Sequence, residues 1–557
     1  MLEDPLLNMP LRTARRTRFF PFSRVTLPPP VGLRIQLRGI KNMLDQGGLD
    51  SATRAASSMM KQAPYDIRVL ALNAQCMAAS HDHIAAIQIY DRLLTQQDSD
   101  VIWAAKARSL MALGRYRRAS SAFARATALA RTTRFIAEQA ACSLAAGKLN
   151  DAFEVLESVD APSKADTSYQ LIRAKVLTEM GELQSAFGFA IRAAENDQTG
   201  QAIALARQNM PEMAPFSALC YRTALRTTSP QVLAEISWDQ PDCITQSNVD
   251  QLVQTIDDPS HDNAEKAHAH LALFRKFDQM GDRFQALGHL RKYHALSAKQ
   301  TKLHRSQDSA MFAMLTQLKA PRLQPSKSRV LPIFVTGLPG SGRQHATAVL
   351  VQAARCDAAR PLSLVPAVMA RFSSQLSENG RTKITRTDLL YLQAELREGL
   401  EQAANGCDVI VDSTALNFRW SGLIAAALPE ARIVHLKRAQ MATGWALHKG
   451  GISGQEFGCH HDLSHIQAFQ HRCAALMAHW EENFAPNVMG ISGDALARSS
   501  GVTVQAMIEA CQLKWSDRCR SVPYCPDRSW HGYAAYLNPL RQPIKTSKNM
   551  TCDHSPM

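Results

Sequence analysis

Small apolar residues recur at a regular interval along the first third of the chain. Five alanines are separated by 33, 34, 33 and 34 residues: Ala52, Ala85, Ala119, Ala152 and Ala186. Four of them follow a glycine by five positions: Gly47, Gly114, Gly147 and Gly181. Small residues let two helices of a hairpin touch, and glycine permits the turn between them. The pattern predicts stacked helical hairpins over residues 31–212.

A similar helix pair, KAHAHLALFRKFDQMGDRFQALGHLRKYHAL, comes later in the chain. Gly281 and Ala286 keep the same five-residue offset, which predicts further helical hairpins over residues 213–317. Residues 318–329 are rich in proline and basic side chains. We predict that this segment is a linker.

The hydrophobic pattern changes after residue 330. Short β-branched runs at 330–335, 407–412 and 431–438 predict buried strands, and 487–493 is a weaker strand candidate. Helical stretches such as 388–406 lie between them, which favours a parallel sheet with helices on both faces. We therefore predict an α/β domain over residues 330–545, with ligands beyond the carboxyl ends of the strands.

The first of these strands leads into a glycine loop and then a helix, VLPIFVTGLPGSGRQHATAVL. Backbone N–H groups in such a loop, together with the helix dipole, form a cradle for an anion. The loop residues predicted to contact a phosphate or sulfate are Gly337, Gly340, Ser341, Gly342, Arg343 and Gln344. Arg438 lies just past another strand end and is expected to face the same crevice. The alternative is an ordinary βα turn.

The composition of the chain indicates the cellular compartment and the extent of two terminal tails. The chain has 557 residues, a formal net charge of +14 and twelve cysteines without a CxxC pair. We find no signal peptide and no apolar run of transmembrane length, so a cytoplasmic protein with reduced thiols is expected. Residues 1–30, basic and proline-rich, and residues 546–557 are predicted to be tails. An anchor on anionic lipid or nucleic acid is an alternative for the first tail. Elsewhere in the chain, basic residues are not interleaved with aromatics in the way that indicates a base-stacking surface.

The repeat unit VIWAAKARSLMALGRYRRASSAFARATAL resembles the tetratricopeptide repeat in the placement of its small and large residues. This resemblance implies a concave surface for a peptide or protein partner. The alternative is that these helices only brace the second domain.

The glycine loop resembles the phosphate-binding loops of two families. The GxxxxG spacing from Gly337 to Gly342, with Asp412 ending a later strand, resembles a P-loop kinase or NTPase. However, Arg343 stands in place of the P-loop lysine and Gln344 in place of the hydroxyl residue that holds Mg²⁺.

The second resemblance covers about 220 residues and is to the bacterial sulfotransferases that carry tetratricopeptide repeats. The motifs are PIFVTGLPGSGRQ, DSTALNFRW, ALPEARIVHLKR, the pair His479–Trp480, and LRQPI at 540–544. The resemblance implies transfer of a sulfuryl group from 3′-phosphoadenosine 5′-phosphosulfate to a hydroxyl or amine, without a metal. It also implies that the loop holds the 5′ end, that Arg438 holds the 3′-phosphate and that Arg541 contributes to the site.

Several positions depart from that family pattern. Gly340 replaces an arginine, Ala446 a serine that helps to grip the 3′-phosphate, Pro361 a glutamate that is a candidate general base, and Ser413 a lysine. The general base is therefore unknown, with Arg343 and His345 as weak catalytic candidates. A catalytically inactive scaffold protein is the rival hypothesis, and it predicts that Gly340→Arg with Ala446→Ser restores activity.

Histidines and cysteines gather in GCHHDLSHIQAFQHRC. His461 and His465 have the i, i+4 spacing of a helical metal pair. Residues 462–464 are instead typical of the start of a helix, so no metal site is predicted.

Overall fold

The computed structural model describes residues 31–45, 48–80, 82–159, 166–197, 200–208, 214–225, 229–298, 305–316, 321–324, 329–355, 359–360, 362–378, 384–404, 406–450, 461–498, 501–522 and 526–541. The chain divides into two compact units, Met1–Ile172 and Arg173–Met557, and each is considered by itself. Both predicted tails lie outside the described residues.

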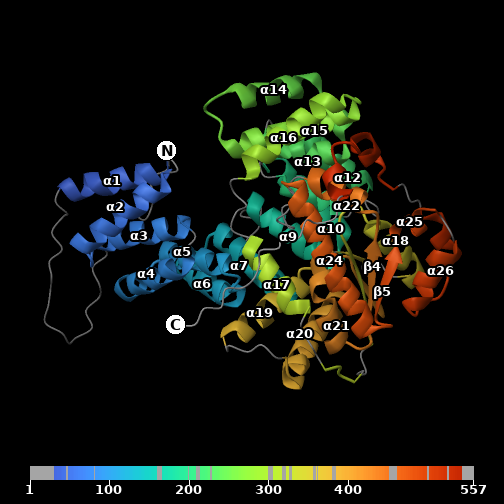
Figure 1. Ribbon diagram of the computed structural model, residues 1–557. Helices are drawn as coiled ribbons and strands as arrows, with labels where there is room; N and C mark the ends of the chain where they lie inside the picture. Colours follow the sequence, from blue (N-terminus) through green and yellow to red (C-terminus); the bar gives the residue numbers. More distant parts are fainter. Residues whose placement is uncertain are drawn as a thin grey trace, which may run out of the picture. The chain divides into compact units, whose positions relative to one another are not determined.

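The first unit is an array of antiparallel helices (Figure 1). Its helices are α1 (Val31–Asp45), α2 (Leu49–Gln62), α3 (Ile67–Ala79), α4 (His83–Gln96), α5 (Asp100–Ala112), α6 (Tyr116–Leu129), α7 (Thr133–Ala145) and α8 (Leu149–Glu157), and α9 (Thr167–Met180) contains the division between the units. Each helix from α2 to α7 packs against the next one in the chain. The predicted repeat-like helical array is confirmed.

The turns between hairpin helices share one geometry. Gly114, Gly147 and Gly181 have φ angles of 70°, 71° and 85°. The residue after each glycine donates its N–H five residues back, as in Arg115 N to Leu110 O at 2.9 Å. This bond closes the Schellman motif, which needs a left-handed residue at the helix end. Gly47, the fourth predicted turn glycine, lies outside the described residues.

One alanine of the predicted repeat is shifted by a residue. In α6 and α8 the buried alanine is the fourth residue after the N-cap. In α4 the N-cap is Asp82, so this position falls on Ala86, which is fully buried, whereas Ala85 is partly exposed. The prediction of Ala85 as the small contact residue was wrong by one position, because α4 begins one residue later than the alanine spacing implied.

Helices also begin the second unit. They are α10 (Leu183–Ala194), α11 (Gln201–Gln208), α12 (Ala214–Ala224), α13 (Pro230–Asp239), the short η2 (Pro241–Cys243), α14 (Gln246–Asp257), α15 (Asn263–Gln279), α16 (Arg283–Ser297) and α17 (Arg305–Thr316). Helices α15 and α16 form the predicted hairpin around Gly281, whose φ is 82°. Within the segment predicted as a linker, Leu323 is buried and donates its N–H to Ala426 O at 3.0 Å.

The α/β domain contains a five-stranded parallel sheet in the order β2-β3-β1-β4-β5. The strands are β1 (Leu331–Gly337), β2 (Ala359–Arg360), β3 (Val409–Asp412), β4 (Arg432–Lys437) and β5 (Val488–Ser492). The predicted parallel sheet is therefore confirmed, including the weaker strand candidate that became β5.

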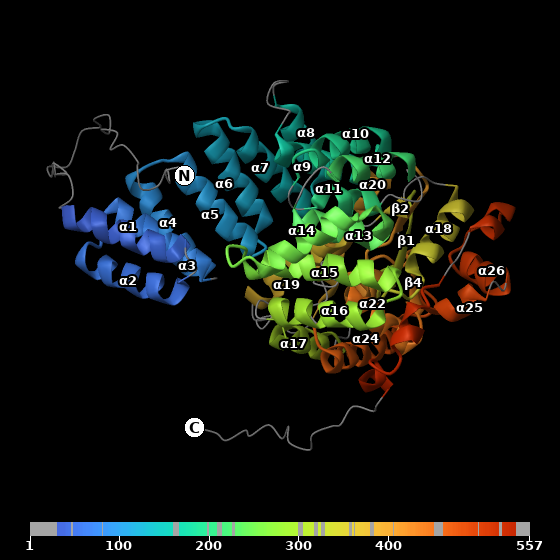
Figure 2. The ribbon, with the colours of Figure 1, turned by 90° about the horizontal axis from the view of Figure 1, so that it is seen from above.

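Helices cover both faces of this sheet (Figure 2). One face packs on α18 (Arg343–Ala354), α25 (Gly493–Ala497) and α26 (Gly501–Ala510). The other face packs on α20 (Arg386–Ala404), α21 (Ser421–Ala427) and α24 (Leu463–Phe484). The remaining elements are α19 (Leu364–Glu378), η4 (Ala415–Trp420), α22 (Gln440–Lys449), η5 (Asp517–Ser521), η6 (Ser529–Tyr533) and η7 (Asn538–Arg541). No helix in the described part of the chain is long and apolar enough to cross a membrane.

Candidate functional site

The glycine loop connects β1 to α18 at the carboxyl edge of the sheet. Thr336, fully buried at the end of β1, donates its hydroxyl to Ala415 O at 2.7 Å. Gly337 lies so close to its neighbours that a Cβ there would stand 2.7 Å from Ser341 Oγ. Helix α18 begins directly after Gly342, which caps it in a left-handed conformation without a side-chain hydrogen bond. The first N–H groups of a helix lack partners within the helix, so this end can receive an anion.

Two side chains of the loop fit that anion. Ser341 is 1% exposed, and its Oγ has no hydrogen-bond partner among the described residues. Arg343, half-buried at the first position of α18, donates from Nη1 to the carbonyl oxygen of Ser413. Its charge is therefore fixed between the loop and the end of β3. Gln344 is exposed and His345 is half-buried on the first turn of the same helix.

Gly340 is pressed against helix α22. Its φ is 77°, and a Cβ at this position would stand 2.8 Å from Ala446 Cβ and 3.3 Å from Ala442 O. An L-residue at this φ is strained, and α22 leaves no room for a side chain. The double variant Gly340→Arg with Ala446→Ser remains a test of the inactive-scaffold hypothesis, but an arginine at residue 340 would require α22 or the loop to move.

Arg438 follows β4 and is brought to the loop, as the sequence predicted. Nη1 donates to Gly340 O at 2.7 Å, Nε to Asp494 Oδ1 at 3.1 Å and Nη2 to Asp527 O at 3.0 Å. The side chain is 5% exposed. All three guanidinium nitrogens therefore bind oxygen atoms of the protein itself.

Asp412, at the end of β3, organises the neighbouring loop. Its carboxylate accepts hydrogen bonds from Thr414 N at 2.8 Å, Thr414 Oγ1 at 2.6 Å, Leu362 N at 3.3 Å and Asn417 Nδ2 at 2.8 Å. Burial raises the pKa of Asp412 above its usual value, and the bonds from Thr414 and its neighbours oppose this rise. The carboxylate is 1% exposed, which supports a structural role for it.

A glutamate in the part of α9 that belongs to the second unit lies at the same edge of the sheet. Glu179 of α9 accepts a hydrogen bond from Ser363 Oγ at 2.8 Å. Ser363 follows Leu362, whose N–H contacts Asp412. The glutamate and the serine are separated by 184 residues in sequence, so no local motif could have revealed this contact. Pro361, at the expected position of the general base, lies outside the described residues.

The later sequence motifs are largely structural. Trp480 is fully buried and packs directly on the backbone of Gly422. Leu540 is also fully buried and packs on Gly444 of α22. Arg541 is exposed at the end of η7, and a ligand-binding role for it stays a prediction.

The described histidines of the 458–473 segment contact different elements. Asp462 caps α24 by accepting from Ser464 N and His465 N, which confirms the predicted helix start. His461 instead faces α16, with its Nδ1 3.1 Å from Nδ1 of His294. No group of three or more possible metal ligands occurs among the described residues.

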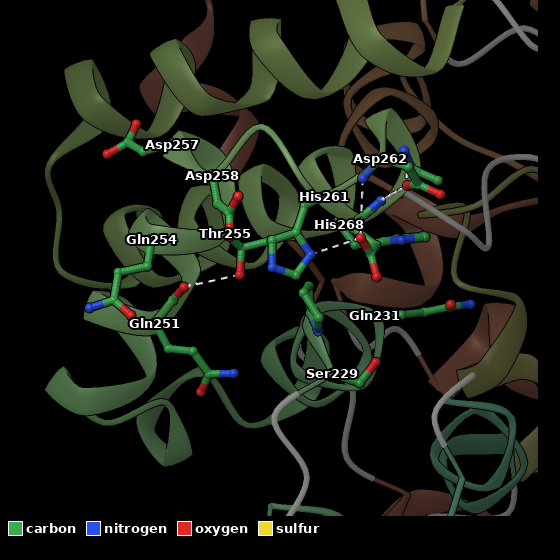
Figure 3. Close-up of a pocket in the computed structure, with 13 residues that line it drawn as sticks. Ser229, Gln231, Gln251, Gln254, Thr255, Asp257, Asp258, His261, Asp262 and His268 are labelled. Atoms are coloured by element: carbon green, nitrogen blue, oxygen red, sulfur yellow. Dashed lines mark hydrogen bonds and ion pairs between the residues drawn. The ribbon is translucent and has the colours of Figure 1, made fainter. Parts of the chain in front are cut away.

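A separate polar pocket of about 960 Å³ lies among α13, α14 and α15 (Figure 3). Its acidic lining includes Asp257, Asp258 and Glu265, and His261 pairs with Glu265 at 2.8 Å. None of the residues predicted to bind the donor lines this pocket. The glycine loop and its surroundings therefore remain the candidate site.

Comparison with known proteins agrees with this placement. Residues 332–517 match the family model described as "Sulfotransferase family". A protein of Aquifex aeolicus (strain VF5), described as an uncharacterized protein, is 26% identical over 208 residues, which is 35% of this chain. The match spans 27% of that relative's length, about a quarter. The C-terminal region thus carries a sulfotransferase-family domain, which begins at the strand before the glycine loop.

Proposed function

We propose that the α/β domain transfers a sulfuryl group from a nucleotide donor of the 3′-phosphoadenosine 5′-phosphosulfate type to an acceptor hydroxyl or amine. The observation that carries this proposal is the anion cradle at the start of α18. It combines the amino-terminal end of a helix that has no side-chain cap, the Arg343 guanidinium and a buried hydroxyl at Ser341 that has no partner among the described residues. The family match over residues 332–517 supports the same chemistry.

The anion cradle would stabilise the negative charge that develops on the transferring group. In the reaction, the acceptor oxygen or nitrogen forms a bond to sulfur while the bond between sulfur and the phosphate oxygen breaks. The leaving nucleotide keeps that electron pair, and the acceptor proton passes to a base. Donors held at fixed positions stabilise such developing charge without reorganisation. Arg343 is fixed in this way by its contact with Ser413.

Glu179 is our candidate for the proton acceptor, and His345 is the alternative. The Glu179 carboxylate lies at the carboxyl edge of the sheet, next to the segment that Asp412 organises. General bases contribute roughly 10²–10⁴-fold to such reactions. Glu179→Gln should therefore slow transfer by that factor while nucleotide affinity changes little. Equal transfer rates in the variant and the wild type would leave His345 as the candidate, to be tested by His345→Asn.

Calorimetric titration tests the donor site before any acceptor is known. Adenosine 5′-phosphate, adenosine 3′,5′-bisphosphate and ATP with Mg²⁺ are titrated into the wild type and into Arg343→Ala. Losing one charge-assisted hydrogen bond costs about 1.5–3 kcal/mol, so adenylate binding should weaken roughly 10- to 100-fold in the variant. Arg386→Ala is the matched control, because Arg386 also begins a helix of this domain but is exposed.

Absence of adenylate binding to a folded protein would refute the donor site, and binding that requires ATP with Mg²⁺ would indicate a kinase or NTPase instead. A second candidate function is a scaffold without catalysis. The engagement of Arg438 with three protein oxygens favours it, because a ligand would have to compete with these partners. Under this hypothesis the helical array, which we assign to tetratricopeptide repeats, would carry the function by binding a protein or peptide partner.

A further inference from the structure

The flank of the glycine loop formed by Arg438 is already occupied by protein groups. Its guanidinium holds the carbonyl oxygens of Gly340 and Asp527 and the carboxylate of Asp494, at 2.7, 3.0 and 3.1 Å. With 5% of the side chain exposed, each guanidinium nitrogen of this arginine already donates to a protein oxygen, so a phosphate would have to compete with these partners. Buried polar groups satisfied in this way are costly to separate.

The charge around Arg438 also disfavours a second phosphate. Asp494 neutralises the guanidinium directly, and it also accepts from Ala439 N at 3.4 Å. Asp527 lies on the other side, with its carboxylate 2.6 Å from Lys449 Nζ. Although partial burial opposes ionisation, Lys449 lowers the pKa of Asp527, so this carboxylate is charged at neutral pH. A phosphate dianion placed here would meet two carboxylates whose cationic partners are already paired.

Alanine side chains of helix α22 fill the space beside Gly340 of the glycine loop. Ala446 provides no hydroxyl, is 8% exposed, and would stand 2.8 Å from a Cβ at Gly340. Its methyl group therefore fills the gap between α22 and the loop. The same wall is continued by Ala442, whose carbonyl oxygen faces Gly340.

From these contacts we infer that the donor is a nucleoside 5′-phosphosulfate without a 3′-phosphate. This inference rests on the proposed function and makes it more specific. The cradle at Gly342 and Arg343 receives the 5′ group, whereas the Arg438 flank excludes a second dianion instead of binding it. Adenosine 5′-phosphosulfate has the required chemistry, and adenosine 5′-phosphate is its desulfated counterpart.

The test compares the affinities of adenosine 5′-phosphate and adenosine 3′,5′-bisphosphate by calorimetry on the full chain. A productive arginine–phosphate contact improves affinity roughly 10- to 100-fold. We expect the bisphosphate to bind no more than about 3-fold tighter than the monophosphate, or to bind more weakly. A bisphosphate that binds 10-fold tighter or more would overturn the inference and leave the proposed function standing. If neither nucleotide binds, the proposed function fails and the inference fails with it.

Asp494→Asn tests the cause of the selectivity. The amide removes a negative charge but can still accept from Arg438, so the fold should be retained, as denaturant unfolding will verify. The affinity ratio of bisphosphate to monophosphate should rise about 3- to 10-fold in this variant. Asp517→Asn, at an exposed site on η5, is the matched control and should leave the ratio unchanged. An unchanged ratio in Asp494→Asn would refute the electrostatic exclusion.

Discussion

Gly340→Ala is the sharpest test of how the glycine loop is seated against α22. The substitution adds one methyl group at a residue with φ of 77°. That methyl group would lie 2.8 Å from Ala446 Cβ and 3.3 Å from Ala442 O. Contacts this close force the helix or the loop to move.

The expected cost has two parts. A non-glycine residue in the left-handed region costs about 1–2 kcal/mol. Forcing an extra methyl group into a packed site costs a further 1–3 kcal/mol, approximately. We therefore expect Gly340→Ala to lower the free energy of unfolding by about 2–5 kcal/mol.

Denaturant unfolding, followed by circular dichroism, measures this cost. Gly406→Ala is the matched control, because Gly406 has a φ of 86° and an added Cβ would meet nothing within 4 Å. The control should show the backbone cost alone. Combining Gly340→Ala with Ala446→Gly should recover the packing part in a double-mutant cycle. Equal costs for Gly340→Ala and Gly406→Ala, with no recovery in the double variant, would refute the contact with α22.

Two further predictions concern stability. Nδ1 of His270 lies 2.9 Å from Nδ1 of His289, and burial, with nearby cations, lowers the pKa of each ring to about 4. The unfolded chain binds protons below pH 6.5 while the folded protein does not, so stability should fall by about 3 kcal/mol per histidine, or about 6 kcal/mol for the pair, between pH 6.5 and 4. The variant His270→Phe with His289→Leu should lose this pH dependence, and a wild type that shows the same pH profile as the variant would contradict the prediction. Gly422→Ala should destabilise by about 1–3 kcal/mol because Trp480 covers it. Gly288→Ala, in open space on α16, should instead stabilise by about 0.5–1 kcal/mol, and the opposite order in thermal unfolding would refute both assignments.

The strands and the hairpins could be predicted because both rest on local patterns. Residues 407–412 and 431–438 are β-branched runs, and the structure turns them into β3 and β4. The error at Ala85 arose where the turn before α4 lacks the glycine that marks the other turns, so the alanine spacing was the only guide. A pattern based on spacing alone cannot detect that a helix begins one residue later than expected.

The chemistry of the site was harder to read from the sequence. The loop glycines and Arg343 were predicted because strand, glycines and helix are contiguous. The partners of Arg438 come from segments 56 to 98 residues away, and Glu179 lies 184 residues from Ser363. Such contacts depend on tertiary packing. The sequence therefore indicated that Arg438 approaches the loop but not that its donors are already engaged.

The most direct test of sulfuryl transfer uses a donor labelled with radioactive sulfur. Adenosine 5′-phosphosulfate and its 3′-phosphorylated form are each incubated with the protein and a panel of hydroxyl and amine acceptors. Nucleotide release and label in the acceptor are then measured together. We predict that both appear in equal amounts with the wild type and fall about 10- to 100-fold in Arg343→Ala. A folded protein that binds the nucleotide yet releases none above the blank with any acceptor would contradict the transferase and favour the scaffold.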